Sequence, residues 1–250
     1  MSEEESENVS EKEPHKKHGH HGGKKPGKKT DEIEAPTKAE IALLEPFAGL
    51  TLAQISVPAT PEEFEKAGAD LMGCRFIGFD TESRPTFQKG EASAGPHIVQ
   101  LTTLGHAYIF QLFREESHRF IAEIIESTHV IKVGFGLQSD KSHLRRKLGI
   151  KPKAILDMDK VFRQQGYRKE LGVKAAVAIL FQQKFQKSKS ATMSNWSAKI
   201  LKDNQLLYAA NDAYAALKVL SVMHIDESEL PITDLPMTEQ SIKDAAITAK

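Results

Sequence analysis

The sequence contains little of what secreted or membrane proteins require. Only one of its 250 residues is a cysteine, Cys74, so the chain cannot form an internal disulfide, which fits a reducing compartment. No apolar run approaches the roughly 20 residues that span a bilayer. The first residues, MSEEESENVSEKE, are acidic where a secretory signal peptide is basic and then apolar. These absences predict a cytoplasmic protein with no membrane segment.

The chain also lacks a net charge, because 34 Lys and Arg residues balance 34 Asp and Glu residues. The net charge therefore does not indicate a nucleic-acid partner, and the distribution of charge along the chain has to be considered instead. Residues 1–40 are poor in apolar side chains, and their acids are separated from a Lys, His and Gly block at 15–29. This composition predicts a disordered tail. The block could chelate a metal or contact phosphates, or it could be solvated, and we assign it no catalytic role.

The rest of the chain has enough apolar residues for a folded core, since 40% of the whole sequence is hydrophobic. Strand-like segments are LTLAQISV, FIGFDTE, HIVQLTTL, AYIFQL and VIKVGFG. Helical patterns cover residues 61–71, 115–127, 137–148 and 204–225. Strands followed by crossover helices predict an α/β domain over residues 50–225, with a mixed sheet flanked by helices. Residues 226–250 are mostly polar and are expected to form an appendage.

Two carboxylates lie near the end of one predicted strand. Asp80 and Glu82 in FIGFDTES are two residues apart, so their side chains point to the same face of the strand. Like charges on one face repel. The pair lies either at a solvated edge or around a divalent cation, because Mg²⁺ and Mn²⁺ prefer oxygen ligands.

A third carboxylate lies in VGFGLQSDKSHL, where an apolar strand is followed by a helix with Asp140 in its first turn. An acid at this position also interacts favourably with the helix dipole, so the residue alone does not indicate a site.

The predicted helix LLYAANDAYAALKVL carries Tyr208 and Asp212 four residues apart, and so on one face. A carboxylate beside a tyrosine on so apolar a helix requires a partner. That partner is either a ligand or, through a hydrogen bond, the tyrosine itself.

Together, and in this order, GFDTE, VGFGLQSD and YAANDAY resemble the three motifs of the DEDD exonuclease superfamily. The similarity is to its tyrosine-containing branch, which includes ribonuclease D and the Werner-type exonuclease domain. It covers roughly residues 51–222, and LGVKAAVAILF and SNWSAKIL are similar to the family's connecting segments. Ser83 departs from the Werner-type motif, which has an aromatic residue at this position. The resemblance implies a ribonuclease H-like fold.

The resemblance also implies the chemistry. It assigns Asp80, Glu82, Asp140 and Asp212 to two divalent cations, Mg²⁺ or Mn²⁺, and it gives Tyr208 the task of orienting the attacking water. The implied activity is 3′-5′ exonuclease hydrolysis that releases nucleoside 5′-monophosphates. Two-metal sites suit this reaction, because one cation activates water and the other stabilises the leaving oxygen.

Between Leu171 and Lys202 the sequence has no acid and six lysines, namely Lys174, Lys184, Lys187, Lys189, Lys199 and Lys202. Such a stretch either follows a phosphate backbone or forms a solvated face. QKSKSATMSNW resembles the family's segment beside the substrate channel, which favours nucleic-acid contacts for Lys187 and Lys189. Trp196 is expected to be a packing residue.

A competing pair, Asp157 and Asp159 in ILDMDKVF, has the same spacing as Asp80 and Glu82. It precedes a helix predicted to begin near Lys160, so a helix cap is favoured over metal binding for one of the two.

The sequence leaves the substrate open between single-stranded or 3′-recessed DNA and RNA, because no residue can be assigned to a 2′-hydroxyl. Two other functions compete with the exonuclease. A catalytically inactive nucleic-acid-binding module of the same fold is disfavoured by the intact carboxylates and tyrosine. A metal-dependent hydrolase of free nucleotides would be indifferent to strand length.

Overall fold

A computed structural model describes residues 33–86, 94–186 and 189–235. The chain divides into two units, Met1–Asp31 and Glu32–Lys250, and the described residues all belong to the second. Most of the predicted tail therefore lies outside the described residues, and so does the end of the predicted appendage.

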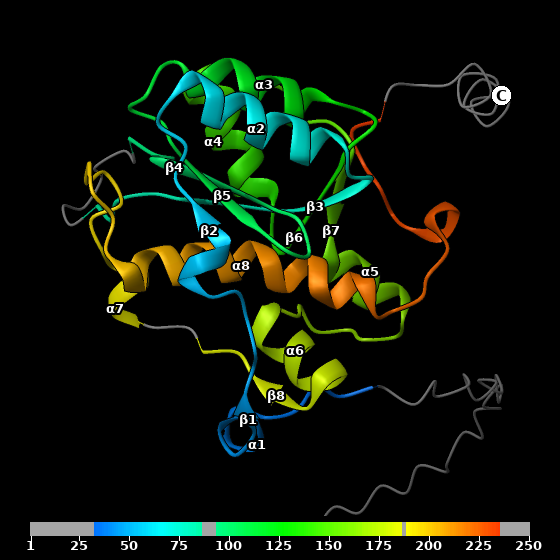
Figure 1. Ribbon diagram of the computed structural model, residues 1–250. Coiled ribbons are helices and arrows are strands. Elements are labelled where there is room, and N and C mark those ends of the chain that lie inside the picture. Colours follow the sequence, from blue (N-terminus) through cyan, green and yellow to red (C-terminus); the bar gives the residue numbers. More distant parts are fainter. Residues whose placement is uncertain (1–32, 87–93, 187–188, 236–250) are drawn as a thin grey trace, which may run out of the picture. The chain divides into compact units, whose positions relative to one another are not determined.

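The described part is built on a six-stranded mixed sheet (Figure 1). Its strands lie in the order β2 (Ile55–Ser56), β5 (Ala107–Gln111), β4 (Ile98–Thr102), β3 (Phe76–Glu82), β6 (Ile131–Gly134) and β7 (Ile155–Asp157). Strand β3 pairs antiparallel with β4 and parallel with β6. The carboxyl ends of β3, β6 and β7 therefore meet at one edge of the sheet.

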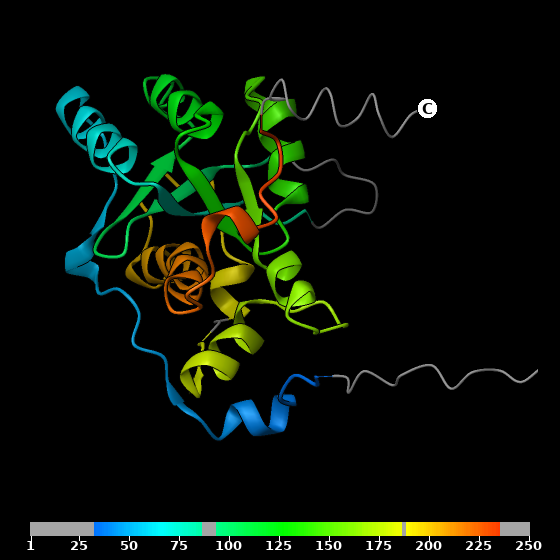
Figure 2. The ribbon, with the colours of Figure 1, turned by 90° about the vertical axis from the view of Figure 1, so that its right-hand side faces the viewer.

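Helices cover both faces of the sheet (Figures 1 and 2). One face packs against α2 (Pro61–Met72), α3 (Ser117–Glu126) and α4 (Gln138–Leu148). The other face packs against α8 (Asp203–Ser221), with α5 (Met158–Gln164) and α6 (Val173–Phe181) beyond it. The predicted α/β fold, a mixed sheet flanked by helices, is confirmed.

The alternation of side chains along β3 separates the two cores. Ile77 and Phe79 are fully buried in the core that α2, α3 and α4 cover. Gly78, Asp80 and Glu82 face the opposite way, toward α8. This strand begins and ends at the residues of the predicted segment FIGFDTE.

Glycine at position 78 allows α8 to lie against the strand. A Cβ atom there would come within 2.2 Å of the carbonyl oxygen of Ala213 and 2.4 Å of Thr102 Oγ1. Such distances are far inside van der Waals contact, so any side chain at this position would push the helix away. Helix α8 presents small buried residues along its length, among them Ala209, Ala213 and Ala216.

Helix α2 matches its prediction, whereas the predicted strand LTLAQISV does not form over its whole length. Helix α2 has Pro61 in its first turn, and its N-cap Thr60 forms a capping box with Glu63. In LTLAQISV, however, a 3₁₀ turn, η1 (Leu52–Gln54), precedes a strand of only two residues. The Gln54 side chain accepts a hydrogen bond from the Thr51 backbone N–H at 3.1 Å, which stabilises the turn in place of an extended strand.

Both ends of the described chain attach to the domain. Near the N-terminus, α1 (Lys38–Ala42) precedes β1 (Glu45–Pro46), which pairs with β8 (Gln183–Lys184). Part of the predicted tail and all of residues 41–49 therefore belong to the described structure.

Near the other end, residues 226–235, assigned by the sequence to an appendage, also pack on the domain. The 3₁₀ helix η2 (Glu227–Glu229) precedes Leu230, which is buried in the core beside α5 and α6. Thr233 then pairs with Ile155 at the edge strand β7. None of the helices in the described ranges has both the length and the apolar character that a membrane span requires.

One buried lysine stabilises the sheet core. The Lys132 side chain in β6 is fully buried, and its ammonium group donates to the backbone carbonyls of Ile124, Ser127 and Val130 at 3.3, 2.6 and 2.7 Å. These bonds satisfy the carbonyls at the end of α3 and in the turn that follows.

We predict that Lys132→Met lowers the free energy of unfolding by roughly 2–4 kcal/mol, because it removes the donor to three backbone carbonyls in or beside the core. Urea unfolding followed by circular dichroism measures the change. Lys153→Met, at an exposed position before β7, is the control and should shift stability by less than about 0.5 kcal/mol. Equal losses in the two variants would show that the buried ammonium group contributes nothing specific.

Candidate active site

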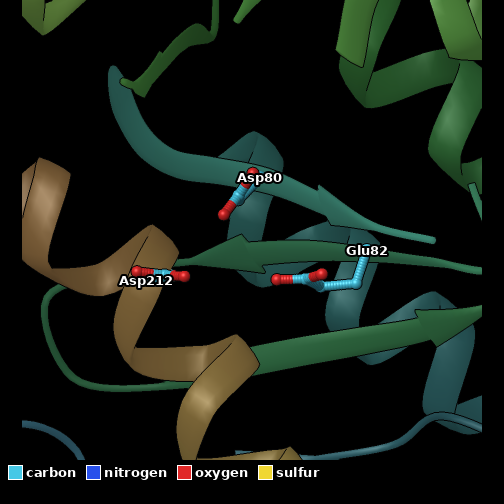
Figure 3. Close-up of side chains that lie close together, drawn as sticks. All are labelled: Asp80, Glu82 and Asp212. Carbon is cyan, nitrogen blue, oxygen red and sulfur yellow. The ribbon is translucent and has the colours of Figure 1, made fainter. Parts of the chain in front are cut away.

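Three acidic side chains meet where β3 lies against α8. One carboxylate oxygen from each of Asp80, Glu82 and Asp212 lies within 4.8 Å of the other two. Figure 3 shows Asp80 and Glu82 projecting from the strand toward Asp212 on the helix. Asp80 and Glu82 are partly buried, and Asp212 is only 6% exposed.

The local sequence explains this convergence. The alternation of strand residues directs Asp80 and Glu82 to the same face as Gly78. Gly78 has no side chain, so the backbone of Ala213 can lie directly against β3. Asp212, the residue before Ala213 on α8, therefore lies close to the strand. Two elements about 130 residues apart in the sequence thus place like charges together.

Asp140, the fourth predicted ligand, lies on a different side of β3. Its carboxylate accepts hydrogen bonds from the hydroxyl groups of Thr81 and Ser139. Thr81 lies between Asp80 and Glu82, and its side chain faces away from α8. Asp140 is 7% exposed, and burial raises the pKa of its carboxyl group. The structure therefore brings three of the four predicted carboxylates together and holds Asp140 beside the strand that carries two of them.

The loop before Asp140 is held by Asp157. The Asp157 carboxylate accepts hydrogen bonds from the backbone N–H groups of Gly136 and Leu137, both at 3.1 Å, and caps α5 through the N–H of Asp159 at 3.2 Å. The predicted capping role is confirmed, although α5 begins at Met158 and not near Lys160. Asp157 also fixes the start of α4, a contact that sequence spacing could not show.

Tyr208 lies one turn before Asp212 on α8 and is 7% exposed. Its hydroxyl is 3.1 Å from the Thr192 hydroxyl, which donates to it from α7 (Lys189–Thr192). Its ring centroid lies 5.8 Å from that of Trp196, which is buried as predicted for a packing residue. The hydroxyl is thus held at a defined position near the carboxylates.

A cleft of about 1280 Å³ opens from this site, and Asp80, Tyr208 and Asp212 all line it. Helix α6, strand β8 and the segment from Pro36 to Leu50 contribute the other walls. The cleft is large enough for several nucleotide-sized groups.

Only some of the six lysines between Leu171 and Lys202 have side chains that the structure describes. Lys187 lies outside the described residues, and Lys189 is the first residue of α7 with a side chain that the structure does not describe. Their assignment to nucleic acid stays a prediction. Of the other four lysines in that stretch, Lys174 and Lys184 line the cleft.

The donor set at the carboxylates fits divalent cations. Asp80, Glu82 and Asp212 offer only oxygen ligands, which hard ions such as Mg²⁺ and Mn²⁺ prefer. Their mutual repulsion in a partly buried position would also be relieved by positive charge.

Comparison with known proteins identifies relatives of this chain. A family model described as 3′-5′ exonuclease matches residues 55–224. The chain is 28% identical over 156 residues to a 3′-5′ exonuclease of Arabidopsis thaliana, which covers 62% of this chain and 54% of that protein. It is 27% identical over 143 residues to a bifunctional 3′-5′ exonuclease/ATP-dependent helicase of Mus musculus, covering 56% of this chain and 10% of the relative. The chain therefore spans about half or less of these relatives.

Solved structures share the fold. The EXO domain of Aedes aegypti Nibbler superimposes with a TM-score of 0.60 at 22% identity, covering 73% of this chain and 97% of that domain. Trypanosoma brucei RNase D in complex with RNA U12 superimposes with a TM-score of 0.61 at 19% identity, covering 72% and 65% of the two chains.

The carboxylate cluster predicts a metal-dependent stability. Saturating Mn²⁺ should raise the melting temperature of the wild type, corresponding to about 2.7 kcal/mol at 100 times the dissociation constant. Asp212→Asn should lose most of this gain. In chelator the variant should melt no lower than the wild type, because the substitution removes one of three like charges.

Differential scanning calorimetry with and without Mn²⁺ makes this comparison. Asp203→Asn, in the exposed first turn of the same helix, is the matched control and should respond to Mn²⁺ as the wild type does. A full Mn²⁺ response in Asp212→Asn would contradict the assignment of a metal site to this cluster.

Proposed function

Since this chain belongs to the 3′-5′ exonuclease family, we propose that it is an active, metal-dependent enzyme that hydrolyses nucleotides from the 3′ end of a nucleic acid. The observation that supports this proposal is that Asp80, Glu82 and Asp212 meet beside a cleft. Asp80, Asp212 and Tyr208 line this cleft. An inactive binding module of the same fold would have no need to keep three like charges within 4.8 Å of one another.

In this proposal Asp80, Glu82 and Asp212 hold two divalent cations, Mg²⁺ or Mn²⁺, and Asp140 completes the acidic set from beside Thr81. Bound cations supply activation of water and stabilisation of the leaving 3′ oxygen. The protein's own task is to keep its carboxylates ionised and fixed. The Thr81 and Ser139 hydroxyls favour the ionised form of Asp140 against the effect of its burial.

We assign Tyr208 to the orientation of the attacking water. A tyrosine hydroxyl is a weak base at neutral pH, so proton abstraction is not its role. Because the Thr192 hydroxyl donates to the Tyr208 oxygen, the tyrosine can direct its own proton toward a water in the cleft.

The proposed substrate is single-stranded or 3′-recessed DNA or RNA, and the proposed products are nucleoside 5′-monophosphates. The Trypanosoma brucei RNase D structure contains RNA, and the mouse relative combines an exonuclease with a helicase, so the names of the relatives favour neither nucleic acid. The cytoplasmic location expected from the sequence stays a prediction.

Digestion of 5′-labelled single-stranded and 3′-recessed DNA and RNA tests the proposal. With Mg²⁺ or Mn²⁺ the wild type should shorten strands stepwise, and chromatography should identify 5′-monophosphates. Asp80→Asn should abolish hydrolysis and keep the fold, because it removes charge and little volume, whereas Asp203→Asn should digest normally. Digestion by Asp80→Asn at the wild-type rate would refute the site. Binding without hydrolysis by the wild type would indicate an inactive module, and hydrolysis of mononucleotides alone a nucleotide hydrolase.

Tyr208→Phe removes only a hydroxyl and keeps the ring that packs near Trp196. We expect turnover to fall roughly 10- to 1,000-fold, which corresponds to about 1.4–4 kcal/mol of transition-state stabilisation, with little change in substrate affinity. Single-turnover digestion and calorimetric Mn²⁺ titration separate the two effects. Asp212→Asn should lose both metal binding and turnover, whereas Tyr208→Phe should titrate Mn²⁺ normally. Wild-type turnover in Tyr208→Phe would remove the tyrosine from the mechanism.

A further inference from the structure

We propose that the segment Pro36–Phe47, with α6 and β8, forms a binding site for backbone phosphates upstream of the 3′ end, and that Lys38, Lys174 and Lys184 are its cations. This inference rests on the proposed function, since it requires that the 3′ end lies at Asp80 and Asp212. The segment lies before residues 55–224, the part of the chain that the family model matches.

The segment is a wall of the same cleft that Asp80 and Asp212 line. Pro36, Lys38, Ile41 and Phe47 line the cleft together with Asp212. Figures 1 and 2 agree that α1, β8 and α6 lie on the side of α8 that faces away from the sheet. The cleft therefore extends from the carboxylates past α8 to this outer wall.

The wall is fixed to the domain by backbone and aromatic contacts. Strand β1 pairs with β8, and the Phe47 N–H donates to the Lys184 carbonyl at 3.0 Å. The Lys184 ammonium group donates to the Ala42 carbonyl at 3.0 Å. The Phe47 ring lies 5.4 Å from that of Phe181 and 6.0 Å from that of Phe185, measured between centroids.

Gly49 and Leu50, which directly follow this wall in the chain, contact Asn211, the residue next to Asp212. The side-chain Oδ1 of Asn211 accepts from the Leu50 N–H at 2.6 Å, and its side-chain Nδ2 donates to the Leu50 carbonyl at 3.2 Å. Gly49 leaves room for this side chain, since a Cβ atom there would come within 2.1 Å of Asn211 Oδ1. Adjacent residues of α8 thus anchor the wall and contribute a carboxylate.

The charges of the cleft are divided along its length. Asp80 and Asp212 lie at the sheet end, whereas the lysines on α1, α6 and β8 lie at the outer end, where Glu170 is the one acid among the lining residues that the structure describes. No ion pair within the described ranges involves Lys38, Lys174 or Lys184. An excess of lysines without acidic partners suits a phosphate backbone.

Aromatic side chains lie in the same cleft. Phe47 and Phe135 are partly exposed and line it. A basic groove with aromatic faces is the usual combination for binding single strands, because bases stack on the rings while lysines contact phosphates. A nucleic-acid strand with its 3′ nucleotide at the carboxylates would therefore place its upstream phosphates, on the 5′ side of that nucleotide, at Lys38, Lys174 and Lys184.

Binding of a labelled 12-nucleotide single strand, as DNA and as RNA, tests this site. All chains carry Asp80→Asn and are measured in Mg²⁺, so that hydrolysis does not interfere. Adding Lys38→Ala and Lys174→Ala should weaken binding and lower the slope of log affinity against log salt by about 1.4, or about 0.7 per phosphate contact. Lys184 is left intact because its ammonium group also supports the wall. A dinucleotide should bind equally to both proteins, since it reaches only the carboxylate end.

The matched control is Lys151→Ala with Lys153→Ala, which removes the same charge at exposed positions before β7, at the opposite edge of the sheet from the carboxylates. The Lys-rich residues 15–29 are present in every variant. An unchanged salt slope in the cleft variant, or an equal change in the control, would overturn the inference. The proposed function itself is tested separately, in the hydrolysis assay with the wild-type chain, where an absence of hydrolysis would refute it.

Discussion

The close approach of α8 to β3 at Gly78 is the contact on which the candidate site depends. The Ala213 carbonyl would lie 2.2 Å from any Cβ atom at position 78, so only glycine lets the helix lie this close to the strand. Two residues further along the strand is Asp80, and one residue before Ala213 on the helix is Asp212. The acidic cluster therefore depends on the contact between Gly78 and Ala213. Loss of this contact would move Asp212 away from Asp80 and Glu82.

The surrounding contacts fix this arrangement from several directions. Asp157 ties the loop before α4 to the edge of the sheet, and Thr81 links Asp140 on α4 to the strand between Asp80 and Glu82. On the other side of the sheet, Asn211 anchors the N-terminal segment beside Asp212. Each contact joins elements distant in the sequence, so the rigidity that phosphodiester chemistry requires comes from tertiary packing and not from any single motif.

The sequence was sufficient for the elements with strong periodicity. The alternation in FIGFDTE and the four-residue spacing of Tyr208 and Asp212 predicted the faces on which these side chains lie in the structure. Residues 33–49 could not be predicted in this way, because their elements are short and their partners, such as Lys184, lie far along the chain. The hydrogen bond between Thr81 and Asp140 was also beyond reach, since it depends on how α4 packs against β3.

The central claim is that the meeting of β3 and α8 forms a cation site for hydrolysis at a 3′ end. Anomalous diffraction from crystals of the full chain, grown with Mn²⁺ and a nucleoside 5′-monophosphate, tests this claim most directly. The account predicts Mn²⁺ peaks coordinated by oxygens of Asp80, Glu82 and Asp212, with the nucleotide phosphate beside them. Mn²⁺ found only at other positions, such as the His-rich residues 15–21, would contradict it.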